Sequence, residues 1–237
     1  MNHSLPEVKE VLILAPHPDD EALGCAGTIM LLNKKGVSST IVFLTNGEKL
    51  YQEPSPVVAE QRKDEVRRAS EMLGCKEPLF LNFPDGEINR NIEKIYNEIY
   101  AIIKKRKPGI IFSPSPIDYH VDHITTSHIA LKLFNTINTF KLTFYEIYST
   151  LRFNYLIDIT EVVEDKKRII LNYKASLYGK PEVYANAALG LNAQRSLFVQ
   201  KNGYYEAFYM IEKNGDLEKI YDYLLYRDLY ENKFKEE

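Results

Sequence analysis

The 237-residue sequence contains only two cysteines and no tryptophan, and its net charge is −3. Cys25 and Cys75 have no Cys-x-x-Cys spacing, which excludes a disulfide framework and makes a reducing cytoplasm the expected location. Because the charges show no basic excess, nucleic-acid binding is not expected. The first ten residues lack the apolar core of a signal peptide, and no apolar run reaches the length of a membrane span, so we expect no membrane insertion.

Two familiar catalytic signatures are also missing. The Gly-x-Gly-x-x-Gly fingerprint that cradles a phosphate does not follow the first expected strand, which argues against a dinucleotide-binding protein. No Gly-x-Ser-x-Gly elbow is present, which argues against a serine hydrolase. Tyrosine, by contrast, is frequent, with 17 copies, and tyrosine-rich surfaces can serve sugar binding or subunit contact. The tyrosine-rich C-terminal part is therefore a candidate surface for a homo-oligomer.

The chain is organised around residues 11–30. The first four residues of this stretch form an unbroken apolar run, Val-Leu-Ile-Leu, which is typical of a strand buried on both faces. Pro16 and Pro18 then restrict the backbone and predict a rigid turn. From Glu21 onward the apolar residues recur at helix spacing. The polar residues in the turn therefore follow the carboxyl end of a strand, where open α/β sheets bind ligands.

One imidazole and three carboxylates crowd this turn, at His17, Asp19, Asp20 and Glu21. Clustered carboxylates repel one another, and burying them unpaired is costly, but a divalent cation would offset their charge. The alternative is a helix N-cap, in which Asp19 or Asp20 caps the helix and Glu21 faces its positive end. A cap explains one or two of the acids, but it explains neither His17 nor the prolines.

A second polar stretch, residues 118–123, has the sequence Asp-Tyr-His-Val-Asp-His. It follows another expected buried strand, at 110–112, and precedes another expected helix. The chain has only five histidines, and three of them fall in the two polar stretches. Imidazoles and acids at the ends of two strands suit a mononuclear zinc site with an open coordination position. We therefore predict one divalent metal ion at these strand ends.

Apolar runs alternate with helix-spaced patterns along the first 150 residues. Strands are expected at 11–15, 40–45, 79–82, 110–112 and 142–148, with helices at 21–35, 57–73, 92–107 and after 123. Beyond residue 150 the expected elements are a strand at 155–159, helices at 160–176 and 183–199, a strand at 204–210 and a helix at 216–231. This order implies an α/β fold with a Rossmann-like, mostly parallel sheet, helices on both faces and an elaborated C-terminal part. No repeat or linker interrupts the chain, so residues 1–237 are predicted to form one domain.

The two polar stretches resemble the motifs of a known family. Residues 15–21, Ala-Pro-His-Pro-Asp-Asp-Glu, resemble the Ala-His-Pro-Asp-Asp-Glu signature of the zinc-dependent de-N-acetylases called the PIG-L or LmbE-like family, with one extra proline. Residues 120–123, His-Val-Asp-His, look like the His-x-Asp-His signature of that family. The resemblance continues at residues 45–48, 62–65 and 83–86. It is good over residues 1–135, and beyond them only the layout is similar.

The resemblance implies a division of roles around a zinc ion. The implied zinc ligands are His17, Asp20 and His123. Asp19 would then lie beside the water that zinc activates, and it would act as the general base. His120 would stabilise the oxyanion and protonate the leaving amine. Asp122 would hold His120 in a protonated, oriented form, although a plain helix N-cap also explains Asp122.

The resemblance also implies substrate contacts. Arg62 and Asp85 would hydrogen-bond to sugar hydroxyls, and Glu48 would shape the floor of the pocket. A surface ion pair with Glu65 or Asp64 also explains Arg62. A Pro-Asp-Gly turn alone also explains Asp85.

The implied activity is a zinc-dependent hydrolysis that removes the acetyl group from an N-acetylglucosamine-type conjugate, a small amino-sugar substrate, and releases acetate and a free amine. Two alternatives stay open, an amidase acting on a thiol conjugate or other small amide, and a non-catalytic metal- or sugar-binding member of the fold. The presence of both Asp19 and His120 argues against the second, because binding alone needs neither a base nor an acid. A phosphoesterase would often need a second metal, and few acids remain unassigned.

Overall fold

The computed structural model describes residues 5–49, 53–211 and 215–227. Seven strands form one sheet in the order β3-β2-β1-β4-β5-β7-β6. They are β1 (Glu10–Ala15), β2 (Ser38–Thr45), β3 (Leu79–Phe83), β4 (Ile110–Pro114), β5 (Lys141–Tyr145), β6 (Tyr155–Asp158) and β7 (Tyr205–Ile211). Strands β1 to β5 pair in parallel, whereas β7 pairs antiparallel with β5 and β6. The predicted mostly parallel α/β sheet is therefore confirmed.

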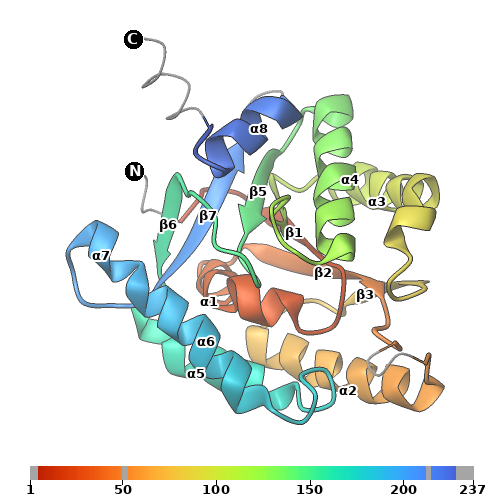
Figure 1. Cartoon of the computed structure of the whole chain (residues 1–237), viewed down its shortest axis with the longest axis horizontal. Helices are drawn as coiled ribbons and strands as arrows, with labels where there is room; N and C mark the ends of the chain where they lie inside the picture. Colours follow the sequence, from red (N-terminus) through yellow and green to blue (C-terminus); the bar gives the residue numbers. More distant parts are fainter. Residues whose placement is uncertain (1–4, 50–52, 212–214, 228–237) are drawn as a thin grey trace.

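Helices cover both faces of this sheet (Figure 1). They are α1 (Asp20–Lys34), α2 (Pro56–Leu73), α3 (Ile92–Arg106), α4 (Val121–Ile137), α5 (Val163–Asn172), α6 (Pro181–Gln194), α7 (Ser196–Val199) and α8 (Leu217–Leu224), with short 3-10 helices η1 (Ile88–Arg90) and η2 (Thr160–Val162). One face carries α1, α2, α5 and α6, and the other carries α3, α4 and α8. No helix among the described residues is long and apolar enough to cross a membrane.

The apolar run of β1 supplies side chains to two separate cores. Val11 and Ile13 join the core that β1 shares with α1, α2 and α5, whereas Leu12 and Leu14 join the core on the side of α3 and α4. All four side chains are fully buried. Successive strand residues point to opposite faces, so a strand covered by helices on both sides has no polar position. This is why β1 reads as a continuous apolar run.

Three C-terminal elements differ from the expected ranges. The helix expected at 160–176 is η2 followed by α5, which ends at Asn172. The helix expected at 183–199 begins earlier, with Pro181 in its first turn, and is divided at Arg195 into α6 and α7. The terminal helix expected at 216–231 is α8, which ends at Leu224, and residues 228–231 of that expectation lie outside the described residues. Helical periodicity located these segments, but it did not locate their breaks.

Helix α1 is interrupted at Cys25, whose backbone is not helical (φ −148°, ψ 17°). The backbone N–H groups of Gly27 and Thr28 therefore donate outside the helix, to Oε1 and Oε2 of Glu206 on β7, at 2.9 and 2.7 Å. The ammonium of Lys166 lies 2.7 Å from the same carboxylate. The Glu206–Lys166 pair thus ties the antiparallel part of the sheet to the helix that follows β1.

Candidate active site

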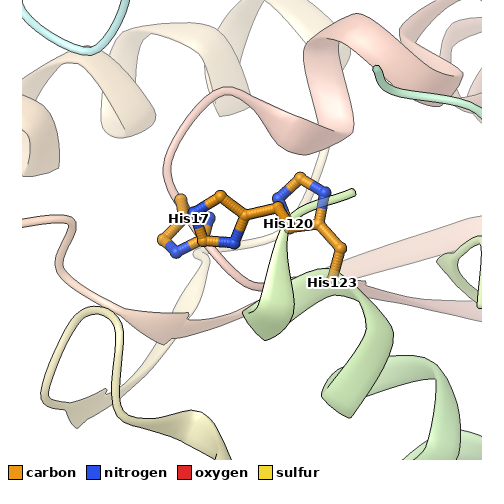
Figure 2. A group of neighbouring side chains, drawn as sticks. All are labelled: His17, His120 and His123. Atoms are coloured by element: carbon orange, nitrogen blue, oxygen red, sulfur yellow. The ribbon is translucent and has the colours of Figure 1, made fainter. Parts of the chain in front are cut away.

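The two polar stretches follow the carboxyl ends of β1 and β4, which are neighbours in the sheet. The chain leaves β1 toward β2 on one side, whereas β4 lies on the other side, so the strand order changes direction between them. In an open α/β sheet, this change of direction leaves a crevice in which ligands bind. Figure 2 shows the imidazoles of His17, His120 and His123 gathered there, His17 from the turn after β1 and the other two from the start of α4.

The turn after β1 has an unusual backbone conformation at Asp19. Its φ of 118° lies in the left-handed region, which costs a non-glycine residue on the order of 1–3 kcal/mol. Asp19 is the N-cap residue of α1 by position, yet its carboxylate caps no backbone N–H of the described helix. Instead, Oδ2 of Asp19 accepts a hydrogen bond from Nη2 of Arg62 at 3.3 Å. The N-cap alternative is therefore wrong for Asp19, whose side chain is turned toward the crevice.

Asp20 lies between two imidazoles. Its Oδ2 atom is 3.3 Å from Nδ1 of His17, and its Oδ1 atom is 3.3 Å from Nε2 of His123. Oδ2 also accepts a hydrogen bond from the backbone N–H of His17 at 2.8 Å. Within the described part of the chain, Oδ1 of Asp20 and both ring nitrogens of His123 have no hydrogen-bond partner. All three atoms are buried; Oδ1 of Asp20 and Nε2 of His123 face each other at the centre of the group, whereas Nδ1 of His123 lies on the side of Asp118.

This donor set suits a divalent metal ion. One carboxylate and two imidazoles are the ligand types of a catalytic zinc site that keeps an open position. Each imidazole also has a carboxylate at its far nitrogen, with Nε2 of His17 lying 3.2 Å from both Asp122 and Asp85, and Nδ1 of His123 lying 3.3 Å from Asp118. Such outer carboxylates orient metal-binding imidazoles. Oδ1 of Asp20 and Nε2 of His123, which have no hydrogen-bond partner among the described residues, are the atoms at which a cation would bind.

Two other groupings of ligand atoms are present among the described residues. In the first grouping, one ring nitrogen from each of His17, His120 and His123 lies within 4.8 Å of the other two. In the second, a ring nitrogen of His17 and one carboxylate oxygen each of Asp85 and Asp122 lie within 4.8 Å of one another. His17 belongs to both groupings and also contacts Asp20. The site therefore concentrates possible metal-binding groups around His17, at the two predicted strand ends.

The charges of the cluster shift the pKa values of its members. Burial lowers the pKa of His17 and of His123, but the surrounding carboxylates outweigh it and hold His17 well above its usual value and His123 at about 9. Burial tends to raise the pKa of Asp20, but His123 and His17 hold it far below its usual value. The carboxylates and the imidazoles of the cluster therefore stabilise each other's charged forms.

Asp19 and His120 are shifted in the directions that their surroundings dictate. Burial raises the pKa of Asp19 well above its usual value, although the Arg62 guanidinium opposes it. Burial and the neighbouring imidazoles of His17 and His123 lower the pKa of His120. The ring of His120 is 4.7 Å from each of these two rings, centroid to centroid.

The Asp122 carboxylate has partners other than the predicted His120. Its Oδ2 atom accepts a hydrogen bond from the backbone N–H of Gly86 at 2.8 Å and lies 3.2 Å from Nε2 of His17, and its Oδ1 atom accepts from the N–H of Ile88 at 3.3 Å. His120 is the N-cap of α4, and its Nδ1 atom accepts a hydrogen bond from the backbone N–H of Asp122 at 3.2 Å. Two expectations are corrected: the Asp122 carboxylate orients His17 instead of His120, and Asp122 is not the helix N-cap.

Arg62 is buried and lines the crevice, so the surface ion pair with Glu65 or Asp64 is wrong. Its Nη1 atom donates to Gly47 O at 2.8 Å, and Nη2 donates to Pro18 O at 2.7 Å. Its Nε atom donates to Oγ of Ser176 at 3.1 Å. These bonds hold the turn that carries Asp19 against the segment after β2.

Glu65 and Glu48 also hold backbone segments in place. The Glu65 carboxylate accepts from the backbone N–H groups of Ala175 and Ser176, at 2.6 and 3.0 Å, and from the Ser176 hydroxyl at 2.8 Å. Oε1 of Glu48 accepts from the N–H of Asp85 at 2.9 Å. Among the described residues, Glu48 supports the Asp85 turn and does not line the crevice.

The crevice is a cavity of about 230 Å³. Its lining contains six of the predicted site residues, which are His17, Asp19, Arg62, Asp85, His120 and His123. Asp85 both forms the predicted turn, in which the N–H of Glu87 donates to Pro84 O at 3.2 Å, and faces the cavity.

Sequence reasoning gave no role to several residues of the site. One of them is Asp118, which contacts His123 and which could have been found because it lies within the second polar stretch. The remaining residues line the cavity, and they are Lys49, Tyr119, Tyr148, Ser176, Tyr178 and Tyr184. Ser176 and Tyr178 come from the connection between α5 and α6, and Tyr184 comes from the start of α6. These segments reach the site only through tertiary packing, so no local pattern identifies the three residues.

Comparisons with known proteins agree with this geometry. The family model described as GlcNAc-PI de-N-acetylase, PIG-L, matches residues 12–134. Diacetylchitobiose deacetylase of Thermococcus kodakarensis is 30% identical over 195 residues, which are 74% of this chain and 73% of that protein. A probable N-acetyl-α-D-glucosaminyl L-malate deacetylase 2 of Bacillus anthracis is 32% identical over 155 residues, 59% of this chain and 66% of that protein.

A solved structure shares the fold. N,N'-diacetylchitobiose deacetylase from Pyrococcus horikoshii, in complex with an inhibitor, superposes with a TM-score of 0.74 at 25% identity. The superposition covers 87% of this chain and 85% of that one. The similarity therefore extends beyond the matched residues 12–134 into the C-terminal part.

Proposed function

Because the chain belongs to the PIG-L family of GlcNAc-PI de-N-acetylases, we propose that it removes the N-acetyl group from an N-acetylglucosamine-type conjugate and that the reaction depends on zinc. The observation that carries this proposal is the unpartnered set of buried atoms on Asp20 and His123, beside a cavity that Asp19 and His120 also line. Relatives that act on acetylated amino-sugar compounds support the substrate class.

His17, Asp20 and His123 would hold the metal ion. When bound, zinc would polarise the amide carbonyl and make a neighbouring water more acidic. These three residues bring the two imidazoles and the carboxylate that such an ion prefers. Asp85, Asp118 and Asp122 would keep the two imidazoles in their orientation.

Asp19 would remove the proton from the water that attacks the amide carbonyl. Burial raises its pKa, which makes it a stronger base than an exposed carboxylate. Its bond to Arg62 fixes the direction of the carboxylate. The proton taken from water would then pass from Asp19 to the amide nitrogen, so the C–N bond breaks with a neutral amine and acetic acid as the first products, and the acid then gives up its proton to become acetate.

His120 would stabilise the oxyanion that develops during the attack. Its Nδ1 atom accepts a hydrogen bond from the backbone of Asp122, so the proton of the neutral ring is assigned to Nε2. A lowered pKa keeps the ring neutral near pH 7, and a neutral ring still donates one hydrogen bond through Nε2. The role of His120 is thus a hydrogen-bond donor, with Asp19 as the proton carrier.

Acetate release from N-acetylglucosamine, N,N'-diacetylchitobiose and N-acetylglucosaminyl malate, measured with the zinc-loaded protein, tests the proposal. We expect His120→Ala to retain zinc and to lose roughly 10²- to 10³-fold in kcat, as expected for loss of an oxyanion donor. His128→Ala is the matched control, since His128 is an exposed histidine of the same helix that bonds Tyr221. Release of no acetate from any of the three compounds by the zinc-loaded wild-type protein would refute the proposal.

A further inference from the structure

Four tyrosines surround the mouth of the active-site cavity. Tyr119 follows β4, Tyr148 follows β5, and Tyr178 and Tyr184 come from the connection between α5 and α6 and the start of α6. Tyr119, Tyr178 and Tyr148 are 72%, 47% and 39% exposed. Three separate segments of the chain thus present accessible aromatic rings at one opening.

The rings continue from the metal-binding residues to the surface. The ring of Tyr148 stacks on His123, with centroids 5.6 Å apart and planes inclined by 9°. Tyr119 lies next, with its ring centroid 5.2 Å from that of Tyr148. The part of a bound ligand that extends out of the cavity on this side therefore contacts the faces of aromatic rings.

The cavity is too small to enclose a whole conjugate. Its volume of about 230 Å³ is below the range of about 300–1,000 Å³ of pockets for drug-sized ligands. A single acetylated sugar ring would occupy it, and whatever is attached to that ring must lie outside, over the tyrosines. A pyranose ring has an apolar face of C–H groups and a polar rim, which matches the apolar body and polar tip of tyrosine.

The segment that carries Tyr178 is held in a fixed conformation. Tyr178 has a φ of 55°, in the left-handed region, which costs on the order of 1–3 kcal/mol for a residue other than glycine. Glu65 binds the preceding backbone at Ala175 and Ser176, and Arg62 binds the Ser176 hydroxyl. A strained residue next to an anchored turn is typical of a ligand-binding segment. The same Arg62 contacts Asp19, so this segment and the proposed base are joined through one side chain.

Resting on the proposed function, we propose that Tyr119 and Tyr178 form an outer subsite that binds a second sugar ring, linked to the N-acetylated ring in the cavity. The preferred substrate class is then a di- or oligosaccharide of N-acetylglucosamine, and the free monosaccharide is the poorer substrate. The outer ring stacks on the exposed faces of these tyrosines, and the acetamido group of the inner ring reaches Asp19 and His120.

Kinetics with two substrates test the outer subsite. The ratio of kcat/KM for N,N'-diacetylchitobiose to that for N-acetylglucosamine is measured in wild type, Tyr119→Ala, Tyr178→Ala and Tyr178→Phe. We expect each alanine variant to lower the ratio roughly 3- to 10-fold, mainly through KM for the disaccharide, because stacking is lost only with the larger substrate. Tyr178→Phe keeps the ring and should stay within roughly twofold of wild type.

Tyr226→Ala is the matched control, because Tyr226 is 48% exposed and lies after α8, outside the described cavity lining. Calorimetry with deacetylated chitobiose gives a readout without chemistry, and its affinity should fall in the two alanine variants alone. Acetate release from the monosaccharide reports the proposed function separately, so a normal monosaccharide rate with an unchanged ratio overturns the subsite alone.

Two further outcomes would also overturn the outer subsite. In the first, the alanine variants change the sedimentation of the protein but not the ratio, which identifies the tyrosines as an interface between copies of the chain. In the second, the variants leave the disaccharide unaffected while Lys49→Ala selectively impairs N-acetylglucosaminyl malate, which identifies an anionic substrate group as the outer ligand.

Discussion

Two groups of buried charged residues contact helix α1, and they differ in how completely their atoms are paired. Glu206 accepts hydrogen bonds from Gly27 and Thr28 and pairs with Lys166, so both of its oxygens are satisfied. In the active-site cluster, which we define as His17, Asp19, Asp20, His120 and His123, buried atoms of Asp20 and His123 have no partner among the described residues.

The comparison separates a structural group from a functional one. Glu206, Lys166 and every member of the active-site cluster except the half-buried His120 are buried, and both groups use carboxylates, so burial and charge do not distinguish them. A buried polar atom without a partner costs about 1–3 kcal/mol, and more where the group is charged. In the described part of the chain, unpaired hydroxyls such as that of Ser70 occur singly, whereas the unpaired carboxylate and imidazole atoms of Asp20 and His123 lie together. This grouping of unpaired ionisable atoms distinguishes the active-site cluster, and substitutions in the two groups should have different consequences.

The largest effect is expected for Asp19→Asn. Loss of a general base typically lowers the rate about 10²- to 10⁴-fold, while the zinc content should stay unchanged because Asp19 is not a proposed ligand. Asp20→Asn should instead lose the metal. Elemental analysis and kcat for acetate release measure both results. If Asp19→Asn emptied the site and Asp20→Asn did not, the two assignments would be exchanged.

Glu206→Ala should destabilise the fold and have no direct effect on the catalytic steps. It leaves the Lys166 ammonium buried without its carboxylate and removes the acceptor of two α1 N–H groups, so we expect a loss of about 3–5 kcal/mol in the free energy of unfolding. Urea unfolding measures it.

The double variant Glu206→Gln/Lys166→Met is the control. It removes both charges and retains a carbonyl acceptor for the α1 backbone, so it should recover most of the lost stability. Equal losses in Glu206→Ala and in the double variant would show that the buried charge of Lys166 is not the cause.

Glu21 is intermediate between the two groups, because it is buried, accepts a hydrogen bond from the Tyr173 hydroxyl and has no cationic partner among its hydrogen bonds in the described structure. Burial raises its pKa to about 7, although the Tyr173 bond opposes the shift. The folded protein thus keeps this proton at pH values where the unfolded chain, with a carboxyl pKa of about 4.3, has lost it. Glu21 therefore lowers the stability as the pH rises from about 4.3 to 7.

Urea unfolding of chelator-treated wild type and Glu21→Gln, at pH 4.5 and at pH 7.5, measures this contribution of Glu21 to the free energy of unfolding. We expect the wild type to lose roughly 3 kcal/mol more than the variant between the two pH values. A parallel dependence of the two proteins would mean that Glu21 is ionised in the folded state at pH 4.5.

The sequence predicted the parallel part of the fold well, because each of its elements has a local signal. Strand β1 is an apolar run, and α2 ends at Leu73, as expected, because Gly74 follows it with a φ of 71°. The break of α1 at Cys25 had no such signal, since it depends on Glu206 of β7, far away in the chain. Its position is set by tertiary contacts.

The candidate site was likewise predicted where the signal is local and missed where it depends on tertiary contacts. The two polar stretches were placed at neighbouring strand ends, because parallel strands bring their carboxyl ends to one edge. The partner of the Asp122 carboxylate was misplaced, because proximity along the chain suggested His120 whereas the folded backbone brings His17 and Gly86 to it. Ser176 was missed because nothing in its own sequence shows that Arg62 and Glu65 meet there.

Ser176→Ala should have the smallest effect, and it tests whether the link between the active-site cluster and the α5–α6 connection is needed for catalysis. The variant loses a bond from Arg62 Nε and one to Glu65. Glu65 keeps two backbone donors, and Arg62 keeps Pro18 O and Gly47 O, so no charged group becomes unpaired. We therefore expect about 1–2 kcal/mol lower stability and a loss below roughly tenfold in kcat/KM.

The matched control for this test is Ser70→Ala, also a buried serine, whose hydroxyl has no hydrogen-bond partner among the described residues. Removing that hydroxyl breaks no bond and removes an unpaired buried group, so the stability should equal or exceed that of wild type and the activity should be unchanged. A loss in Ser176→Ala as large as that of Asp19→Asn would mean that the orientation of Asp19 depends on the whole chain of bonds through Arg62. The α5–α6 connection would then belong to the catalytic machinery as much as the two polar stretches do, and the contrast between paired and unpaired groups would no longer separate structure from function.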